Sequence, residues 1–198
     1  MMTDIMSQNV NEYLEILQKA KLNSDIEVSH YATTSIMEIQ REFEINLQKT
    51  ERRYNEHPED EKNFDRYISA IKDYIESGLI FDKILSIYQK RYVEMLEIKI
   101  QKSPDSRVSF MNAIDCYLDM GEYENARRLI DRAIVKWNNN EGPWLRKIRL
   151  CQLTNEGYVL AHTINEIKRR RIYLTGEGKA ALAFWDNTQT KGVEIYND

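Results

Sequence analysis

Residues 107–137 have the sequence RVSFMNAIDCYLDMGEYENARRLIDRAIVKW, which contains two amphipathic segments separated by a tight turn. Apolar side chains recur in each segment at intervals of three or four residues, the spacing of one face of an α-helix. They are Phe110, Ile114, Tyr117 and Leu118 in the first segment, and Ala126, Leu129, Ile130, Ala133, Ile134 and Trp137 in the second. Gly121 lies in the turn, where a glycine can adopt positive φ and end the first helix. The stretch therefore predicts a helical hairpin.

Six residues of this hairpin fall at offsets similar to those of a tetratricopeptide repeat. They are Tyr117, Gly121, Tyr123, Ala126, Ile130 and Ala133. The sequence departs from that pattern at Ala113-Ile114, where Leu-Gly is frequent, and at Asn138, where proline is frequent. The hairpin resembles the repeat, and an ordinary hairpin in an unrelated all-α domain remains the alternative.

A second copy follows the first. The number of residues from Phe110 to Trp144 equals the number from Tyr117 to Cys151. Tyr158 and Ala161 follow Tyr123 and Ala126 at a slightly longer interval, which indicates one extra residue in the second turn. Pro143 is expected at the first helical position, where its missing N–H has no cost. Upstream, a degenerate unit is indicated by Tyr92, Leu96, Ile100 and Pro104, so the resemblance spans about residues 62–173.

The N-terminal part predicts a short helix near residues 10–21 and then a long one that ends near residue 54 or 55. Ser24 and Glu27 fit a capping box at the start of the long helix. Its apolar stripe consists of Val28, Ala32, Ile36, Ile39, Phe43 and Leu47. A helix of this length spans about 45 Å. The stripe either packs on its own domain or pairs with a second copy of the chain, which leaves open a homodimer through this helix.

Two further helices are expected at about residues 64–78 and 81–101, and Thr175 can cap a final one. Leu182, Phe184 and Trp185 would cover the apolar face of the last repeat. The predicted fold is all-α, with antiparallel helical hairpins stacked as a short tetratricopeptide-like solenoid between an N-terminal long helix and a C-terminal capping helix. The predicted organisation is a helical arm (1–57), a repeat domain (58–187) and a flexible tail (188–198).

The composition limits the classes of function. Among 198 residues, 42% are hydrophobic, and only seven are glycine and three proline, which disfavours a turn-rich β-fold. No apolar run approaches the roughly 18 residues of a membrane span, and no signal peptide is recognisable. The net charge of −4 argues against nucleic-acid binding. The basic run 168–171 either complements a helix C-terminus or binds an acidic partner or an anionic membrane surface.

Groups for catalysis or metal binding are not predicted. Cys116 and Cys151 lack metal-ligand spacing and are expected to be reduced and buried. The three histidines (His30, His57 and His162) are scattered, and there is no Gly-rich phosphate loop. Asp115 and Asp119 lie one helical turn apart, but a solvated face explains such a pair better than an acid/base couple. We therefore expect no enzymatic activity, no cofactor and no metal.

The resemblance implies that the first helices of successive repeats line a concave groove that holds a segment of another protein. The residues expected there are Met111, Asp115, Leu118, Asp119, Leu145, Arg149 and Gln152. Leu118 and Leu145 are expected to face outward as apolar anchors, and Arg149 to contact a carboxylate of the partner. The expected function is that of a non-enzymatic adaptor in the cytoplasm.

A second resemblance suggests a setting for this adaptor. Residues 74–80 (YIESGLI), 88–92 (YQKRY) and 183–185 (AFW) are similar to the repeat-bearing cytoplasmic part of the Pel-type bacterial exopolysaccharide export machinery. Members of that family are expected to carry a membrane anchor, which is not recognisable in this sequence, so the chain would reach the inner face of the membrane through a membrane-bound partner. The alternative is a regulatory or helper domain of a larger signalling or transcription system.

Overall fold

The computed structural model describes residues 2–176 and 178–184, with side chains from residue 12 onward. Throughout these residues the chain is helical and contains no strand, apart from an isolated bridge between Asn140 and Tyr173. The all-α prediction is therefore confirmed. The chain forms two compact units, Met1–Tyr92 and Val93–Asp198, which we describe separately. The predicted boundary at residue 57 falls in a turn inside the first unit.

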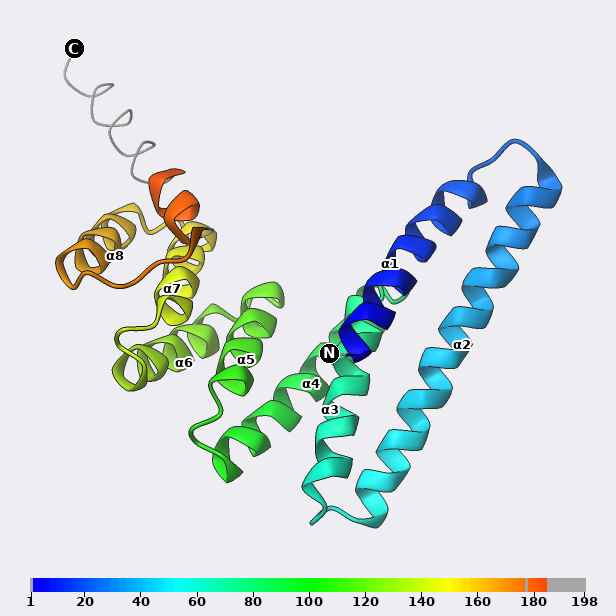
Figure 1. Ribbon diagram of the computed structural model, residues 1–198, viewed down its shortest axis with the longest axis horizontal. Helices are drawn as coiled ribbons and strands as arrows, with labels where there is room; N and C mark the ends of the chain where they lie inside the picture. The colour runs from blue at the N-terminus through cyan, green and yellow to red at the C-terminus, as the bar shows by residue number, and fades with distance from the viewer. Residues whose placement is uncertain (1, 177, 185–198) are drawn as a thin grey trace. The chain divides into compact units, whose positions relative to one another are not determined.

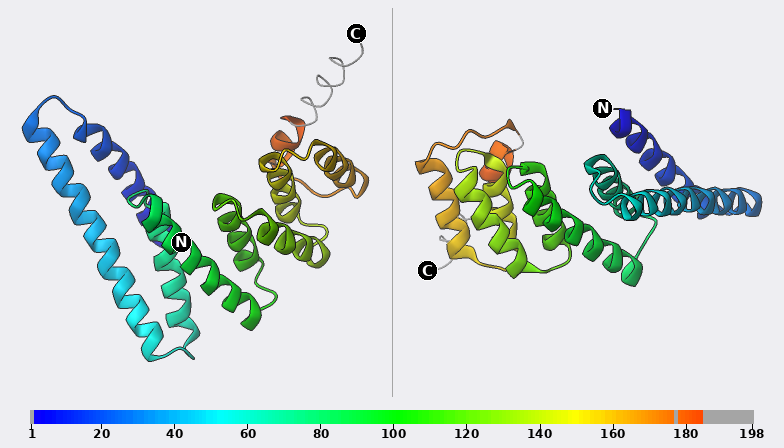
Figure 2. Two further views of the ribbon diagram at one scale, coloured as in Figure 1. Left: turned by 180° about the vertical axis from the view of Figure 1, so that it is seen from behind. Right: turned by 90° about the horizontal axis from the view of Figure 1, so that it is seen from below.

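The first unit is built around one long helix, α2 (Ile26–Glu56). The preceding helix α1 (Met2–Lys21) and the following helix α3 (Glu61–Glu76) both pack against α2. Figure 1 shows α1 along the N-terminal half of α2 and α3 along its C-terminal half, and the two views in Figure 2 agree. With 31 residues, α2 is about 45 Å long, as predicted.

The start of α2 differs from the prediction by one residue. Asp25, not Ser24, is the N-cap, and its carboxylate accepts from the backbone N–H of Glu27 at 2.9 Å and of Val28 at 3.5 Å. A carboxylate is the stronger acceptor at the positive end of a helix, because the helix dipole adds to the hydrogen bonds. The predicted capping box is therefore wrong in its first member.

The apolar stripe of α2 packs within its own chain. Phe43 stacks on Tyr74 of α3 with ring centroids 6.2 Å apart, and Leu47 is buried. Tyr54 stacks on Phe64 and Tyr67 at 5.1 and 5.5 Å. Of the two alternatives for this stripe, packing on its own domain is confirmed for Ala32, Phe43 and Leu47, whereas Val28 is 39% exposed. A pairing with a second chain would have to use another face of α2.

The boundary between the two units, after Tyr92, falls inside helix α4 (Asp82–Lys102). In the second unit, the C-terminal part of α4 is followed by two hairpins. They are α5 (Arg107–Asp119) with α6 (Tyr123–Lys136), and α7 (Glu141–Leu153) with α8 (Gly157–Arg169). Helix α6 contacts both α5 and α7, α7 contacts α8, and α5 also contacts α7. Pro143 is the third residue of α7 rather than the first, and it is still within the turn whose N–H groups have no helical acceptor.

The two hairpins repeat with a constant period. The number of residues from the start of α5 to the start of α7 equals the number from the start of α6 to the start of α8. The buried positions Ala126, Leu129, Ile130 and Ala133 of α6 correspond at this spacing to Leu160, Thr163, Ile164 and Ile167 of α8. The predicted extra residue, which matched Ala126 with Ala161, is therefore wrong. The second turn needs no extra residue because Asn155 takes the place of Gly121.

Both turns have the same hydrogen bonds. Gly121 has φ of +74°, and the N–H of Glu122 donates to the carbonyl of Tyr117 at 2.9 Å. Asn155 has φ of +58°, and the N–H of Glu156 donates to the carbonyl of Cys151 at 2.8 Å. These are Schellman motifs, which satisfy the last carbonyls of a helix. The helix end predicted at Gly121 is confirmed.

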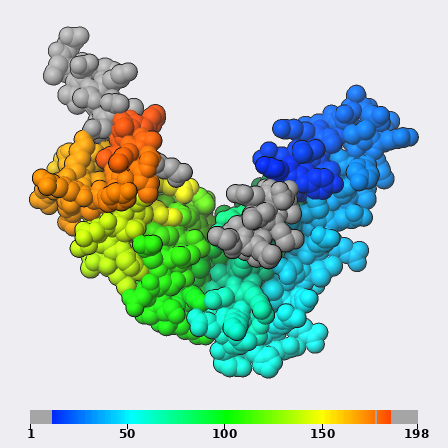
Figure 3. Space-filling model, viewed as in Figure 1, coloured from blue at the N-terminus to red at the C-terminus, as the bar shows by residue number. Residues whose placement is uncertain are grey.

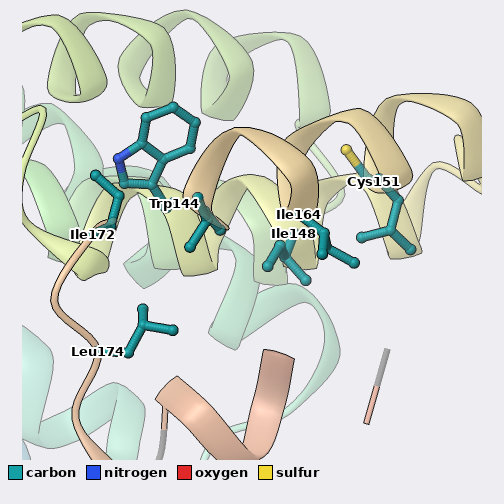
Figure 4. Packing of buried hydrophobic residues seen from close by; sticks show 8 residues of the cluster. Trp144, Ile148, Cys151, Ile164, Ile172 and Leu174 are labelled. Atoms are coloured by element: carbon teal, nitrogen blue, oxygen red, sulfur yellow. The ribbon is translucent and has the colours of Figure 1, made fainter. Parts of the chain in front are cut away.

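A segment after α8 covers the end of the second hairpin (Figure 4). Ile172 and Leu174 belong to a buried cluster with Trp144, Ile148 and Ile164, and Leu182 packs against it. Thr175 accepts from the N–H of Gly178 at 3.3 Å and so caps the last helical segment, as predicted. Phe184 is 60% exposed, so it covers the repeat less completely than expected. The predicted contribution of Trp185 and the predicted tail 188–198 lie outside the described residues.

Candidate partner-binding site on α5 and α7

Four charged side chains meet where α5 and α7 lie side by side. Asp115 and Asp119 are four residues apart on α5, and Arg146 and Arg149 are three residues apart on α7. Both spacings place the members of a pair on one face of a helix. Because α5 contacts α7 directly, the acidic pair and the basic pair are neighbours in space.

The four groups form a network of ion pairs between the two helices. Nη2 of Arg149 donates to Oδ1 of Asp119 at 2.6 Å, and Nη1 of Arg149 lies 3.7 Å from Oδ1 of Asp115. Arg146 donates to Oδ2 of Asp115 and to the carbonyl of Gly142. The Asp119–Arg149 pair is about half exposed, whereas the Asp115–Arg146 pair is more buried. The network therefore presents its Asp119–Arg149 end to solvent.

The structure brings together only some of the residues predicted to line a groove. Asp115, Asp119, Arg149 and Gln152 retain exposed surface on α5 and α7. Leu118 is 3% exposed and Met111 is buried, so the expectation that Leu118 faces outward is wrong. The reason is helical geometry: Leu118 comes one turn after Ile114, which is fully buried, and shares its face. Leu145 packs partly against the buried cluster.

Arg146 was not predicted as a site residue. The signal for it is present in the sequence, because Arg146 precedes Arg149 by one turn just as Asp115 precedes Asp119. The pairing becomes apparent only when α7 is placed next to α5, since the interacting residues are 30 or 31 positions apart. Arg149 was predicted to contact a partner and is already paired within the chain.

The surroundings of Cys116 and Cys151 raise the pKa of both thiols and so lower their reactivity. Burial, followed by the charges of Asp119, Glu122 and Asp115, raises the pKa of Cys116 to about 12. Burial also raises the pKa of Cys151. Both cysteines are buried thiols outside any disulfide, as predicted, and remain neutral near pH 7. Neither is suited to act as a nucleophile.

The basic run 168–171 has a structural explanation for two of its members. Nη2 of Arg169 and Nε of Arg170 each donate to Glu166 at 2.9 Å. The guanidinium of Arg170 also lies 5.3 Å from the ring centroid of Trp144. Lys168 and Arg169 are in the last turn of α8, where positive charge is favourable. This favours the interpretation of the run as a helix C-terminal charge cluster.

In the part of the chain that the structure describes, no three His, Cys, Asp or Glu side chains are grouped so that they could hold a metal ion. None of the helices described is both long and apolar enough to cross a membrane. Comparisons with protein-family models, curated proteins and solved structures find no match to the chain.

Proposed function

We propose that this protein is a non-enzymatic adaptor, which holds a segment of another protein against the surface formed by α5 and α7. The observation that carries the proposal is the constant period of the two hairpins, because it sets α5 and α7 side by side and brings four charged groups onto one surface. Repeats of this kind expose the same helix of each unit along one continuous face.

The same observations support a tetratricopeptide-like arrangement as part of the proposal. The helix starts, the buried positions and the Schellman turns all recur with one period. That period matches the tetratricopeptide repeat, which is about 34 residues long. The contact of α5 with α7 and of α6 with α7 is the pattern expected when a second hairpin stacks on a first. The sequence departs from the repeat at Leu160, which stands where the first hairpin has Ala126.

The charge order on this surface indicates what kind of segment it would bind. Acidic groups come from α5 and basic groups from α7, so a segment that crosses both helices meets the two signs in a fixed order. Exposed ion pairs contribute only about 0–1 kcal/mol, so Asp119 and Arg149 can exchange their internal pairing for charges on a partner at low cost. We expect this exchange to decide which partner binds more than how tightly it binds.

A charge swap tests the proposal while it preserves the ion pair. The double change Asp119→Arg with Arg149→Asp keeps an ion pair between the two helices but reverses the charge order of the exposed pair. The matched control, Asp131→Lys with Lys147→Asp, swaps an ion pair between α6 and α7 instead. The first variant should lose capture of the cognate protein while it stays folded, with at most a small decrease in melting temperature because the carboxylate at position 149 lies near Asp115, and the control should retain capture. Wild-type capture by the first variant would place the binding surface elsewhere.

The identity of the captured protein distinguishes the settings. The resemblance to the Pel-type export machinery supports a membrane protein of polysaccharide synthesis as the partner of a cytoplasmic adaptor. A signalling protein or a transcription regulator in the same experiment would instead support the alternative of a regulatory or helper domain. Co-purification from cells at native expression, with the two swap variants in parallel, therefore tests both the surface and the setting.

A further inference from the structure

The outer face of α2 is exposed and carries apolar side chains. Tyr31 is 68% exposed and Ile45 is 53% exposed, whereas Phe43 and Leu47 face α3 and the core. Two depressions lie along this face, one between Ile26 and Thr34 and the other between Ile45 and Glu56. In the space-filling view, atoms of α2 reach the surface along much of the helix (Figure 3). A face with these properties suits a second helix.

The exposed residues follow a heptad spacing. They alternate in steps of four and three residues, and we call this line of eight residues the outer seam. It consists of Glu27, Tyr31, Thr34, Glu38, Arg41, Ile45, Gln48 and Arg52. All eight are exposed. Positions with this alternation form a single line on an α-helix that can contact a partner helix over its whole length.

The charges of the outer seam are arranged about its centre. Glu27 and Glu38 lie in the N-terminal half, and Arg41 and Arg52 lie in the C-terminal half. Glu38 and Arg41 are equally far from the point between residues 39 and 40, and so are Glu27 and Arg52. An antiparallel copy related by a two-fold axis at this point therefore places each glutamate opposite an arginine. A parallel copy would place like charges opposite each other.

The uncharged positions obey the same symmetry. Thr34 falls opposite Ile45 of the copy, and Tyr31 falls opposite Gln48. The residues that line the first depression fall opposite residues that line the second. Arg52 pairs with Glu56 of its own helix at 2.8 Å, but its side chain is 81% exposed and accessible to a second chain. This arrangement leaves the apolar stripe of α2 in its contacts with α1 and α3, because the outer seam lies on another face of the helix.

We propose that α2 pairs with α2 of a second copy of this chain in an antiparallel arrangement through the outer seam. The two-fold axis passes between residues 39 and 40, and Glu38–Arg41 and Glu27–Arg52 form ion pairs across it. The seam is more polar than that of a permanent coiled coil, so the dimer depends on protein concentration and on salt. This association is independent of the surface on α5 and α7.

Charge reversal with a mixing experiment tests the pairing. Either Glu38→Arg or Arg41→Glu alone places like charges opposite each other at both symmetry-related contacts between positions 38 and 41. Each change should weaken dimerisation about tenfold or more. An equimolar mixture of the two variants restores opposite charges and should form a heterodimer. Sedimentation equilibrium at about 0.1 M ionic strength measures both. Glu124→Arg on α6 makes the same change in net charge as Glu38→Arg and should leave the dimer intact.

Cysteine cross-linking tests the orientation. A Thr34→Cys chain mixed with an Ile45→Cys chain should form a mixed disulfide, and the Thr34→Cys chain alone should form none with itself. A cross-link of Thr34→Cys with itself would indicate parallel pairing and overturn the proposal. A wild-type protein that stays monomeric up to about 100 μM, a concentration far above a micromolar Kd, would also overturn it. So would a dimer that Glu38→Arg leaves unchanged while its helicity is retained.

Discussion

Among the described residues of the second unit, three end helices in the left-handed conformation, and only one of these three is a glycine. They are Gly121, Asn155 and Arg171, with φ of +74°, +58° and +53°. In each case the next N–H donates to a carbonyl five residues earlier, as Ile172 does to Ile167 at 3.2 Å. At Arg171 the conformation is held because Ile172 is buried in the cluster around Trp144. At Arg171 the chain therefore accepts backbone strain because the following residue has a place in the core.

The turn at Gly121 is suited to a test of the backbone alone. A Cβ at this position would meet no atom closer than 4.0 Å, so Gly121→Ala adds strain from positive φ and no clash. We expect a loss of about 1–2 kcal/mol in the free energy of unfolding, measured by chemical denaturation. Gly157→Ala is the matched control, because Gly157 starts α8 and its Cβ also meets nothing. This control should be neutral or stabilising by up to about 1 kcal/mol. Equal effects of the two changes would contradict the role of φ.

The buried thiols should be protected and should make stability fall at high pH. Because burial raises the pKa of Cys116 from 9.0 to about 12, the folded chain retains this proton between those values while the unfolded chain loses it. The corresponding stability is complete below pH 9.0 and is lost as the pH rises towards 12. At pH 8 a disulfide reagent should react far more slowly with Cys116 than with a cysteine placed at exposed Glu124. Similar rates for the two thiols would contradict the burial of Cys116.

At the scale of the element, helices and their inward faces were predictable because side-chain periodicity is a local property. The hairpin 107–137, the long helix and the cap at Thr175 all follow from spacing within one helix. The sequence does not predict features that depend on neighbours in space. Helical spacing alone does not show that Leu118 is buried or that Arg146 pairs with Asp115, and it does not indicate that Asn155 ends a helix in the left-handed conformation.

The cap of the second unit can be tested at two apolar residues of the same segment. Leu174 is buried in the cluster with Trp144, so Leu174→Ala should cost about 2–5 kcal/mol through lost contacts and a cavity. Phe184→Ala removes a larger side chain that is 60% exposed, and should cost less than Leu174→Ala, at most about 1–2 kcal/mol. Denaturant titration of both variants gives the comparison. A larger effect at Phe184 would mean that the segment packs differently.

At the scale of the whole molecule, the division into two compact units predicts that damage to one unit leaves the other folded. Phe43→Asp places a charge against the ring of Tyr74 and should abolish the hydrogen-exchange protection of α1, α2 and α3. Amides of α5 to α8 should remain protected. Met37→Asp, at an exposed position of the same helix, should preserve protection in both units. A simultaneous loss in both units upon Phe43→Asp would show that the chain unfolds as one cooperative structure.

The constant period of the two hairpins also bears on how a chain of this kind can change its length. Ser106 and Asn140, which are one period apart, each provide the N-cap of the helix that follows. Residues 107–140 therefore form a module that begins after one cap and ends with another. Tandem duplication of this module inside the gene would add a complete hairpin and keep every later helix in frame with its cap. An insertion of another length would lengthen a helix or a turn without adding a complete hairpin, so growth by whole modules is the route that this repeat favours.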